Sequence, residues 1–549
     1  MLTGRPGRDT RHTRAASYIA AATAIVGVAA AIHYSRLGLT LTHYDARAHL
    51  VVARRVLDSL TPGWQQIGAV WLPLPHVLNM LPVQVDAWYR TGASGVAISI
   101  ASMALAAGSL ASLLLRVTGS VTAAVTGAAL MMLNPNVLYL QSTPMTEPLL
   151  FGLTLLAVAA TARWLDESPV RTPTVAGCAL AAACLTRYEA WAVTAAIVAI
   201  AVAVLLRRGT PFRAAIRDGA PLALWPTVAI VVFTMNSRWV VGEWFVTGDF
   251  FVPENVEALG NPTAAWRQID EGLTRLSGSA LVWAGYAGAA VIAFEFVRSK
   301  ARASLALLLA LVAAAALPMV AYVQGHPFRI RYDLPLVTAA AALATGGISV
   351  LPRRLQPIIG VLLLLLTVRQ ATPLDREAPL VRESQREAGA MAGRRAVTAY
   401  LQAHYDGSTI MMSMGSLGHY MHDLSSIDLD IKDFLHEGNG KAWEFAMLGP
   451  AGRAGWLIVE EHAEGGDTLY HASKRDRWLD GFEKVAEGGG VALYRASASN
   501  GLPAAPHNDT TSRRHEDFKS SECRAVATSS RRALPKAAAF GRAANPLRI

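Results

Sequence analysis

Long stretches without a charged residue recur along most of this chain, and they constrain its fold more than any other feature. The first stretch lies between Arg14 and Arg36, and others follow at intervals up to Arg369. A helix needs about 20 consecutive apolar residues to cross the hydrocarbon core of a bilayer. The sequence therefore predicts an α-helical polytopic membrane protein whose transmembrane domain covers 15–369.

The composition supports a membrane protein over a soluble or nucleic-acid-binding one. Charged residues make up 16% of the 549 residues and hydrophobic residues 52%, whereas a soluble domain carries about 25% charged residues. The net charge of +10 is compatible with a nucleic-acid partner, but the arginines cluster between the apolar stretches, as membrane topology requires. We therefore expect the lipid bilayer, and no nucleic acid, among the partners.

One region can be divided into spans in two ways. The segment 174–208 contains the charged stretch "TRYEAW" (Thr186–Trp191), so it is either one long helix or two short spans. Two spans keep the later basic turns on the cytoplasmic side together with the N-terminal segment 1–14, and the positive-inside rule favours this choice. It predicts about 11 spans in a multi-pass plasma (inner) membrane protein. The loop 40–93, "TRYEAW" and everything after Arg369 then lie on the extracytoplasmic side.

The pattern of the chain changes after the last apolar stretch. We expect 370–387 to be a linker and 388–496 to be a small extracytoplasmic α/β domain, because strand-like runs alternate there with helix-like stretches. The strand-like runs are Thr409–Gly415, Gly455–Glu461 and Val491–Ala496. The rest, 497–549, is rich in Ala, Ser, Arg and Asn, which predicts a disordered tail.

The predicted outer loop 40–93 begins with the first strongly polar stretch, "THYDARAHLVVARR" (Thr42–Arg55). A Trp- and Pro-rich segment follows at 62–82, and Trp prefers the depth of the membrane interface. The loop is therefore predicted to stay at the membrane surface. A carboxylate held there, Asp45, can act as a general base on a hydroxyl.

Asp45 also has a simpler interpretation, as an interfacial carboxylate that pairs with Arg47 or Arg54. Arg47 and His49 are further candidates for orienting a substrate or binding its phosphate. Arg54 and Arg55 are expected to anchor the loop at the interface.

Two more polar clusters are predicted at the same face, where ionisable groups at membrane depth are costly and usually functional. Glu147 opens a span, either as a carboxylate favoured by the helix dipole or as a second acidic group in the cavity of Asp45. Arg187 and Glu189 form either an internal ion pair or part of the lining of that cavity.

The stretch "GHPFRIRYDLP" (Gly325–Pro335) is either a simple turn or a phosphate site. It contains His326, Arg329, Arg331 and Tyr332. Two arginines on the outer face run against the positive-inside trend, and guanidinium groups bind phosphate in bidentate fashion. A lipid phosphate at the membrane surface is the expected ligand.

Metal binding has little support in the sequence. His419, His422 and His436 lack the spacing of a zinc site. The run "IDLDIKD" (Ile427–Asp433) lacks the glycine and the final glutamate of a calcium loop.

Four features together resemble the integral-membrane glycosyltransferases of the GT-C superfamily: the first-loop Asp45, "VWLPLPHVL" (Val70–Leu78), "TRYEAW" and "RIRYDLP" (Arg329–Pro335). They are most similar to bacterial protein O-mannosyltransferases and aminoarabinose lipid A transferases, and the resemblance covers 15–369. It implies an enzyme that transfers a sugar from a polyprenyl-phosphate donor to a hydroxyl of a glycan, lipid or protein acceptor, with inversion, on the extracytoplasmic face.

The resemblance also implies roles for single residues. Asp45 matches the catalytic base, Arg329 or Arg331 the cations that stabilise the leaving phosphate, and Glu147 a second acidic residue of the cavity. Some relatives hold a divalent metal with an Asp-x-Asp motif. Here Arg47 stands where the second aspartate would be, so a metal cofactor is not supported.

Two other classes of protein stay open. A transporter or flippase of a lipid-linked sugar would need inverted repeats and broken helices, and the sequence contains no corresponding halves. A non-catalytic membrane sensor would bind a ligand with the C-terminal domain. The gathering of polar residues at one face favours an enzyme that acts on a lipid head group.

Overall fold

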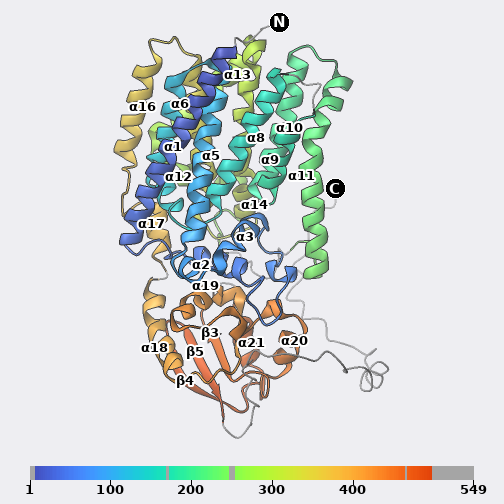
Figure 1. The fold of residues 1–549 in the computed structure, drawn as a ribbon, viewed down its shortest axis with the longest axis vertical. Helices are drawn as coiled ribbons and strands as arrows, with labels where there is room; N and C mark the ends of the chain where they lie inside the picture. Colours follow the sequence, from blue (N-terminus) through green and yellow to red (C-terminus); the bar gives the residue numbers. More distant parts are fainter. Residues whose placement is uncertain (1–5, 168–171, 246–253, 387, 464–465, 498–549) are drawn as a thin grey trace. The chain divides into compact units, whose positions relative to one another are not determined.

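The computed structural model describes residues 6–167, 172–245, 254–386, 388–463 and 466–497 (Figure 1). They belong to one compact unit, Met1–Pro503. A bundle of apolar helices is followed by a small domain built on a five-stranded sheet. This confirms the predicted fold class, a polytopic helical membrane protein with a small C-terminal α/β domain. The predicted disordered tail lies, apart from Ser497, outside the described residues.

The described residues contain eight helical segments that are long and apolar enough to cross a membrane. These are Arg11–Arg36, Ala93–Thr118, Glu147–Glu167, Glu189–Arg207, Phe212–Val240, Ser279–Arg298, Lys300–Val323 and Ile330–Val350. Three shorter apolar helices, Val121–Met132, Thr174–Cys184 and Gln356–Gln370, accompany them. The two groups together account for the predicted count of about 11 apolar segments, of which eight are long enough to cross a membrane.

The helices of the bundle run side by side in Figure 1. In chain order they are α1 (Pro6–Arg36), α5 (Ala93–Thr118), α6 (Val121–Met132), α7 (Pro135–Leu140), α8 (Glu147–Glu167), α9 (Thr174–Cys184), α10 (Glu189–Arg207), α11 (Phe212–Val240), α12 (Pro262–Ser277), α13 (Ser279–Arg298), the 3₁₀ helix η3 (Lys300–Ala315), α14 (Ala316–Val323), the short 3₁₀ turn η4 (Ile330–Asp333), α15 (Leu334–Val350) and α16 (Gln356–Gln370).

Two chain breaks follow directly from the sequence. The helix α9 ends at Cys184 and α10 begins at Glu189, so the break falls within "TRYEAW". It separates a short apolar helix from one that is long enough to cross a membrane. Between α6 and α7, the Asn134 side chain accepts hydrogen bonds from the N–H groups of Asn136 and Val137. Asn at the N-cap followed by Pro135 is a strong start signal for a new helix.

The helix α15 lies at the centre of the bundle, and 94% of the residues in its most apolar stretch are buried. Small residues allow this position. A Cβ on Gly288 of α13 would lie 2.1 Å from the carbonyl oxygen of Leu343 in α15, so the two backbones approach as closely as glycine permits. Small residues at such contacts are typical of packed membrane helices. The packing of α15 fixes the turn η4 at its start, and η4 carries part of the site described below.

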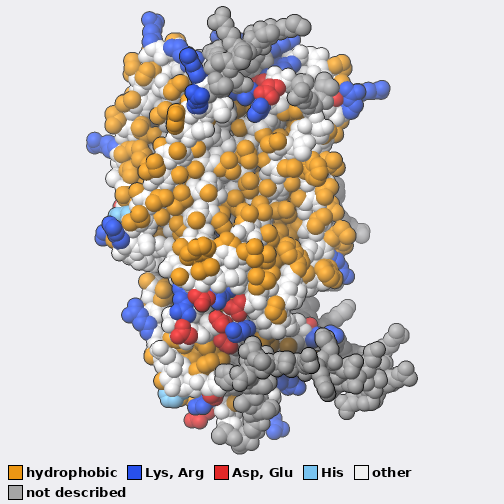
Figure 2. Space-filling view, in the orientation of Figure 1, with side chains coloured by type: hydrophobic (Ala, Val, Ile, Leu, Met, Phe, Trp, Pro, Cys, Tyr) orange, Lys and Arg blue, Asp and Glu red, His pale blue; other side chains and the backbone are white. Residues whose placement is uncertain are grey.

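Basic residues and their partners gather at one end of the bundle. At one end, Arg116 pairs with Glu167 at 2.9 Å, Arg208 pairs with Asp166 at 2.6 Å, and Arg353 donates to the carbonyl of Gly119 at 2.9 Å. The predicted basic turns therefore contact one another. On the face drawn in Figure 2, hydrophobic side chains cover the bundle, and charged ones gather at its ends and at the junction with the sheet domain.

The loop 40–93 lies at the other end of the bundle. It forms α2 (Tyr44–Arg54), η1 (Trp64–Ile67), α3 (Leu74–Asn79), η2 (Pro82–Gln84) and α4 (Asp86–Thr91). In Figure 1, α2 lies between the bundle and α19 (Met414–Leu424) of the sheet domain. Trp64 and Trp88 are about half exposed.

The C-terminal part begins with α17 (Pro379–Ser384), inside the predicted linker, and continues with α18 (Ala388–His404). The sheet has the strand order β2-β1-β3-β5-β4. Its strands are β1 (Ile410–Met412), β2 (Phe434–Leu435), β3 (Trp456–Glu460), β4 (Phe482–Gly488) and β5 (Val491–Ala496), and β1 is parallel to both β2 and β3. The three predicted strand-like runs contain β1, β3 and β5, whereas β2 and β4 were not predicted.

Helices cover both faces of the sheet. Ile410 and Met412 pack with α18 and with α19 (Met414–Leu424) on one face. Met411 points the other way, toward α20 (Lys441–Leu448) and α21 (Thr468–Ser473). This alternation is the period of a strand that is buried on both faces.

Candidate functional site

Asp45 is buried at the start of α2 and forms an ion pair with Arg331 of η4. The side chain of His43 caps α2, and its Nδ1 accepts a hydrogen bond from the N–H of Asp45 at 3.1 Å. Asp45 is 6% exposed and Arg331 8%. Arg331 has a further nitrogen, Nη1, which finds no hydrogen-bond partner among the described residues. The pair therefore joins the first loop to the central helix and leaves one guanidinium donor free.

The environment keeps Asp45 ionised. Burial opposes the charged form and would raise the pKa of Asp45. The guanidinium of Arg331, together with smaller contributions from other neighbours, outweighs burial, so the pKa falls from its ordinary 3.8 to about 2. An opposite charge in direct contact has this effect on a carboxyl group. Asp45 is thus a carboxylate at neutral pH, able to accept a proton.

A pair of histidines lies beside Asp45 on the same loop. The Nδ1 atom of His49 is 3.0 Å from Nε2 of His76, and the ring of Trp71 lies 4.1 Å from that of His49. Burial lowers the pKa of both histidines, that of His76 to about 3. Two neutral imidazoles therefore form a polar wall that adds no charge to the site.

Arg187 brings two predicted carboxylates together. Its Nη1 lies 3.0 Å from Oε1 of Glu147, and its Nη2 lies 2.7 Å from Oε1 of Glu189. The internal Arg187–Glu189 pair considered above is therefore present. The charge of Arg187 also contributes to the low pKa of His49, after burial and the larger effects of other neighbours. The three residues are thus part of the charged cluster around Asp45.

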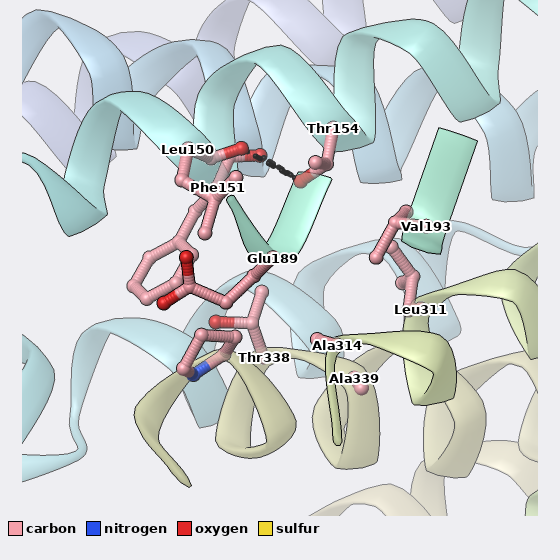
Figure 3. Close-up of a pocket in the computed structure, with 10 residues that line it drawn as sticks. Leu150, Phe151, Thr154, Glu189, Val193, Leu311, Ala314, Thr338 and Ala339 are labelled. Atoms are coloured by element: carbon pink, nitrogen blue, oxygen red, sulfur yellow. Dashed lines mark hydrogen bonds between the residues drawn. The ribbon is translucent and has the colours of Figure 1, made fainter. Parts of the chain in front are cut away.

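Glu189 also lines a cavity inside the bundle, between α8, α10, η3 and α15 (Figure 3). Thr154 and Thr338 project into it among apolar side chains. The cavity measures about 20 Å³, enough for one water molecule. A sugar does not fit there without side-chain movement.

The other predicted residues of the turn before α15 lie around Arg331. The rings of His326 and Tyr332 are 5.5 Å apart, and Nδ1 of His326 lies 2.8 Å from the carbonyl oxygen of Pro327. Burial lowers the pKa of His43 to about 3, and nearby arginines, among them Arg329, add to this. Arg329 is therefore close enough to the cluster to act on it electrostatically.

The guanidinium group of Arg47 pairs with the sheet domain and not with Asp45. Arg47 is 1% exposed and pairs with Asp423 of α19, in the sheet domain. The structure places neither Arg47 nor Arg54 against Asp45, so the interpretation of Asp45 as their partner is wrong. The structure indicates that Arg47 holds the sheet domain on α2.

The prediction that Arg54 and Arg55 anchor the loop at the interface is also wrong. Arg54 is buried among carboxylates, at 2.8 Å from Asp58, 2.7 Å from Asp86 and 3.3 Å from Asp430. Arg55 donates to the carbonyl of Gln66. Both guanidinium groups are held inside the protein because carboxylates and carbonyls of the loop and the sheet domain surround them.

Sequence reasoning missed Glu383, which α17 brings to the site. Its pKa is raised by burial, although the charge of Arg331 acts in the opposite direction. Its Oε2 has no hydrogen-bond partner within the described part of the chain. The residue lies in the predicted linker, where no motif distinguishes it.

In the described ranges, no three His, Cys, Asp or Glu side chains are grouped so that they could hold a metal ion.

The bundle, the helical loop at its polar end and the α/β domain after the last apolar helix together define a polytopic membrane fold with a small C-terminal domain. Among solved structures, the chain is similar to ArnT from Cupriavidus metallidurans. The crystal structure of ArnT bound to undecaprenyl phosphate has a TM-score of 0.51 at 12% identity, with 87% of this chain and 99% of that chain covered. For apo ArnT the TM-score is 0.52 at 12% identity, with 87% and 98% covered.

These matches confirm the resemblance stated from the sequence at the level of the fold. No protein-family model matches the chain, and no curated protein matches it either.

Proposed function

We propose that this protein is a membrane glycosyltransferase that transfers a sugar from a polyprenyl-phosphate donor to an acceptor hydroxyl, with inversion, on the extracytoplasmic face of the plasma (inner) membrane. The buried ion pair between Asp45 and Arg331 carries the proposal. The reaction needs a base for the hydroxyl and a cation for the leaving phosphate, and the pair contains one of each. The structure of ArnT, which has the same fold, holds undecaprenyl phosphate and supports a lipid of this type as the carrier.

The free Nη1 of Arg331 can bind the phosphate of the donor, and this binding would change the basicity of Asp45. A phosphate oxygen bound there would share the positive charge that now stabilises the Asp45 carboxylate. Since burial opposes that carboxylate, the pKa of Asp45 would rise once the donor is bound. The base therefore becomes stronger when the leaving group is in place.

The transfer itself then needs one proton acceptor and one anion site. Asp45 accepts the proton of the acceptor hydroxyl, and the hydroxyl oxygen attacks the anomeric carbon from the side opposite the phosphate. The bond between that carbon and the phosphate oxygen breaks, and its electron pair leaves with the lipid phosphate. We propose that Arg331 and Arg329 neutralise this leaving group in place of a divalent metal.

The surrounding residues have binding roles in this proposal. His49 is neutral, and Arg187 pairs with the two carboxylates Glu147 and Glu189. These four residues bind sugar hydroxyls in this proposal. His326 and Tyr332 flank the arginine turn and contact the sugar or its phosphate. Arg47, paired with Asp423, positions α2 and does not bind the donor.

The proposal is tested with purified protein in lipid nanodiscs and a panel of radiolabelled polyprenyl-phosphate sugars, with cell-envelope extract as the source of acceptors. Asp45→Asn should lower transfer by about 10²–10⁴-fold, the contribution of a general base. Asp86→Asn is the matched control, because Asp86 lies on the same loop with its side chain 62% exposed.

Transfer by Asp45→Asn at the wild-type rate would refute the role of the base. Movement of the lipid-linked sugar across liposomes without any transfer would support a transporter instead.

A further inference from the structure

A polar groove lies on the C-terminal domain, between α18 and α19. It measures about 440 Å³, within the range of small-molecule and cofactor sites and far larger than the cavity at Glu189. Arg394, Thr398 and Gln402 follow one another along α18 at intervals of one helical turn, and Asp423 lines the groove from α19. The spacing places the three α18 side chains on one face of the helix.

Arg394 is the buried and firmly held side chain of this groove. It is 2% exposed, its Nη1 lies 2.6 Å from Nε2 of His419, and its Nη2 donates to Glu460 at 2.8 Å. Its Nε has no hydrogen-bond partner anywhere in the described ranges. A buried donor without an acceptor is unfavourable, and a ligand oxygen in the groove would satisfy it.

The inner wall of the groove adjoins the helix that carries the proposed base. Asp423 pairs with Arg47 of α2, and the ring of His419 lies 6.3 Å from that of Tyr44. Arg47 and Tyr44 flank Asp45 in the sequence. A ligand in the groove would therefore sit next to α2, the helix that carries Asp45, on the side of the sheet domain.

Most of the charges that line the groove are paired. Arg394 is compensated by Glu460 and Asp423 by Arg47, and the exposed Arg395 is the one lining residue whose charge has no ion-pair partner among the described residues. The amide of Gln402 and the hydroxyl of Ser426 both donate and accept hydrogen bonds, which matches the hydroxyl groups of a sugar. We propose that this groove binds a hydroxyl-rich glycan, which is the acceptor of the transfer. The acceptor role rests on the proposed function; glycan binding as such does not.

The test uses the full-length protein in nanodiscs on a printed array of short oligosaccharides, with unglycosylated peptides on the same array. Ala399 lines the groove at an exposed position of α18, so Ala399→Trp should fill it and abolish glycan binding. Ala442→Trp is the matched control, because Ala442 is exposed on α20, across the sheet. It should bind as the wild type does. Gln402→Ala creates no bulk and should weaken binding about tenfold, the effect of one lost hydrogen bond.

Three results would overturn the inference: no glycan bound by the wild type, undiminished binding by Ala399→Trp, or binding to peptides alone. Circular dichroism and gel filtration of each variant separate a filled groove from a misfolded domain. Sugar transfer is measured on the same preparations. If Ala399→Trp loses glycan binding but the wild type cleaves no polyprenyl-phosphate sugar, the proposed function is refuted and the groove remains a glycan site. Transfer together with undiminished binding by Ala399→Trp would sink the groove alone.

Discussion

The ion pair of Arg47 with Asp423 should hold the sheet domain on α2, and replacing Asp423 with Asn tests this. Arg47 is 1% exposed, and Asp423 is its only carboxylate partner among the described residues. The guanidinium would stay buried with its charge uncompensated. Removing one partner of a buried pair costs about 3–5 kcal/mol. We expect about 3 kcal/mol, the low end of that range, because the side chain of Asp423 is 26% exposed.

The opposite substitution, Arg47→Met, should cost less. It leaves a carboxylate that is partly solvated and has the ring of His422 at 3.9 Å, while Met fills much of the buried volume. The double variant Arg47→Met/Asp423→Asn removes both charges and should recover most of the loss, since buried pairs can often be replaced by neutral groups. The resulting coupling energy should be about 1–3 kcal/mol.

The measurement is denaturant-induced unfolding in detergent, followed by tryptophan fluorescence and combined with hydrogen exchange. Protection of α19 should fall in Asp423→Asn, and protection of α16, within the bundle, should not change. A coupling energy near zero, or unaltered protection of α19, would refute the claim that this ion pair holds the sheet domain on α2.

Two further outcomes are expected. A Cβ at Gly272 would lie 2.0 Å from Oδ2 of Asp333, so Gly272→Ala should destabilise the protein by about 1–3 kcal/mol in the same unfolding assay. Gly389→Ala, in α18 with nothing within 4 Å, should be neutral or slightly stabilising, and equal effects would contradict the packing of α12. Because Arg331 holds the pKa of Asp45 at about 2 against burial, wild-type kcat/KM should not fall between about pH 7 and pH 4, and the stability from ionised Asp45 should be lost only as the pH drops from 3.8 toward 2. Arg331→Gln removes the largest influence that opposes burial, so the acid limb of the residual activity should move to higher pH. An unmoved limb would show that another group is the base.

The sequence predicts the spans well because their signal is local. Charge-free length and the side on which arginines accumulate were enough to divide 174–208 into α9 and α10. They also placed Asp45, Arg187 and Arg331 at one end of the bundle, where the structure brings them together. Each of these inferences depends on the order of charged and apolar residues along the chain and on no contact between distant residues.

What the sequence did not reveal depends on partners that are distant in the chain. Arg47 and Arg54 have the sequence context of interface residues, and only the folded sheet domain supplies Asp423 and Asp430. The strand β4 was missed because its side chains are mostly exposed or half-buried, so it lacks an apolar pattern. The strand β2 has two residues, too few for any periodicity to show.

The docking of α2 on the sheet domain has a consequence for the order in which the protein is made. Arg47 is separated from Asp423, and Arg54 from Asp430, by 376 residues. Chains fold from the N-terminus during synthesis, so α2 reaches the membrane surface while its acidic partners have yet to leave the ribosome. A nascent chain that stops after α16 would contain every apolar helix of the bundle, yet two guanidinium groups on α2 would lack these partners. Docking of α2 on the sheet domain is therefore a late step of biogenesis, because both acidic partners follow α16 in the chain.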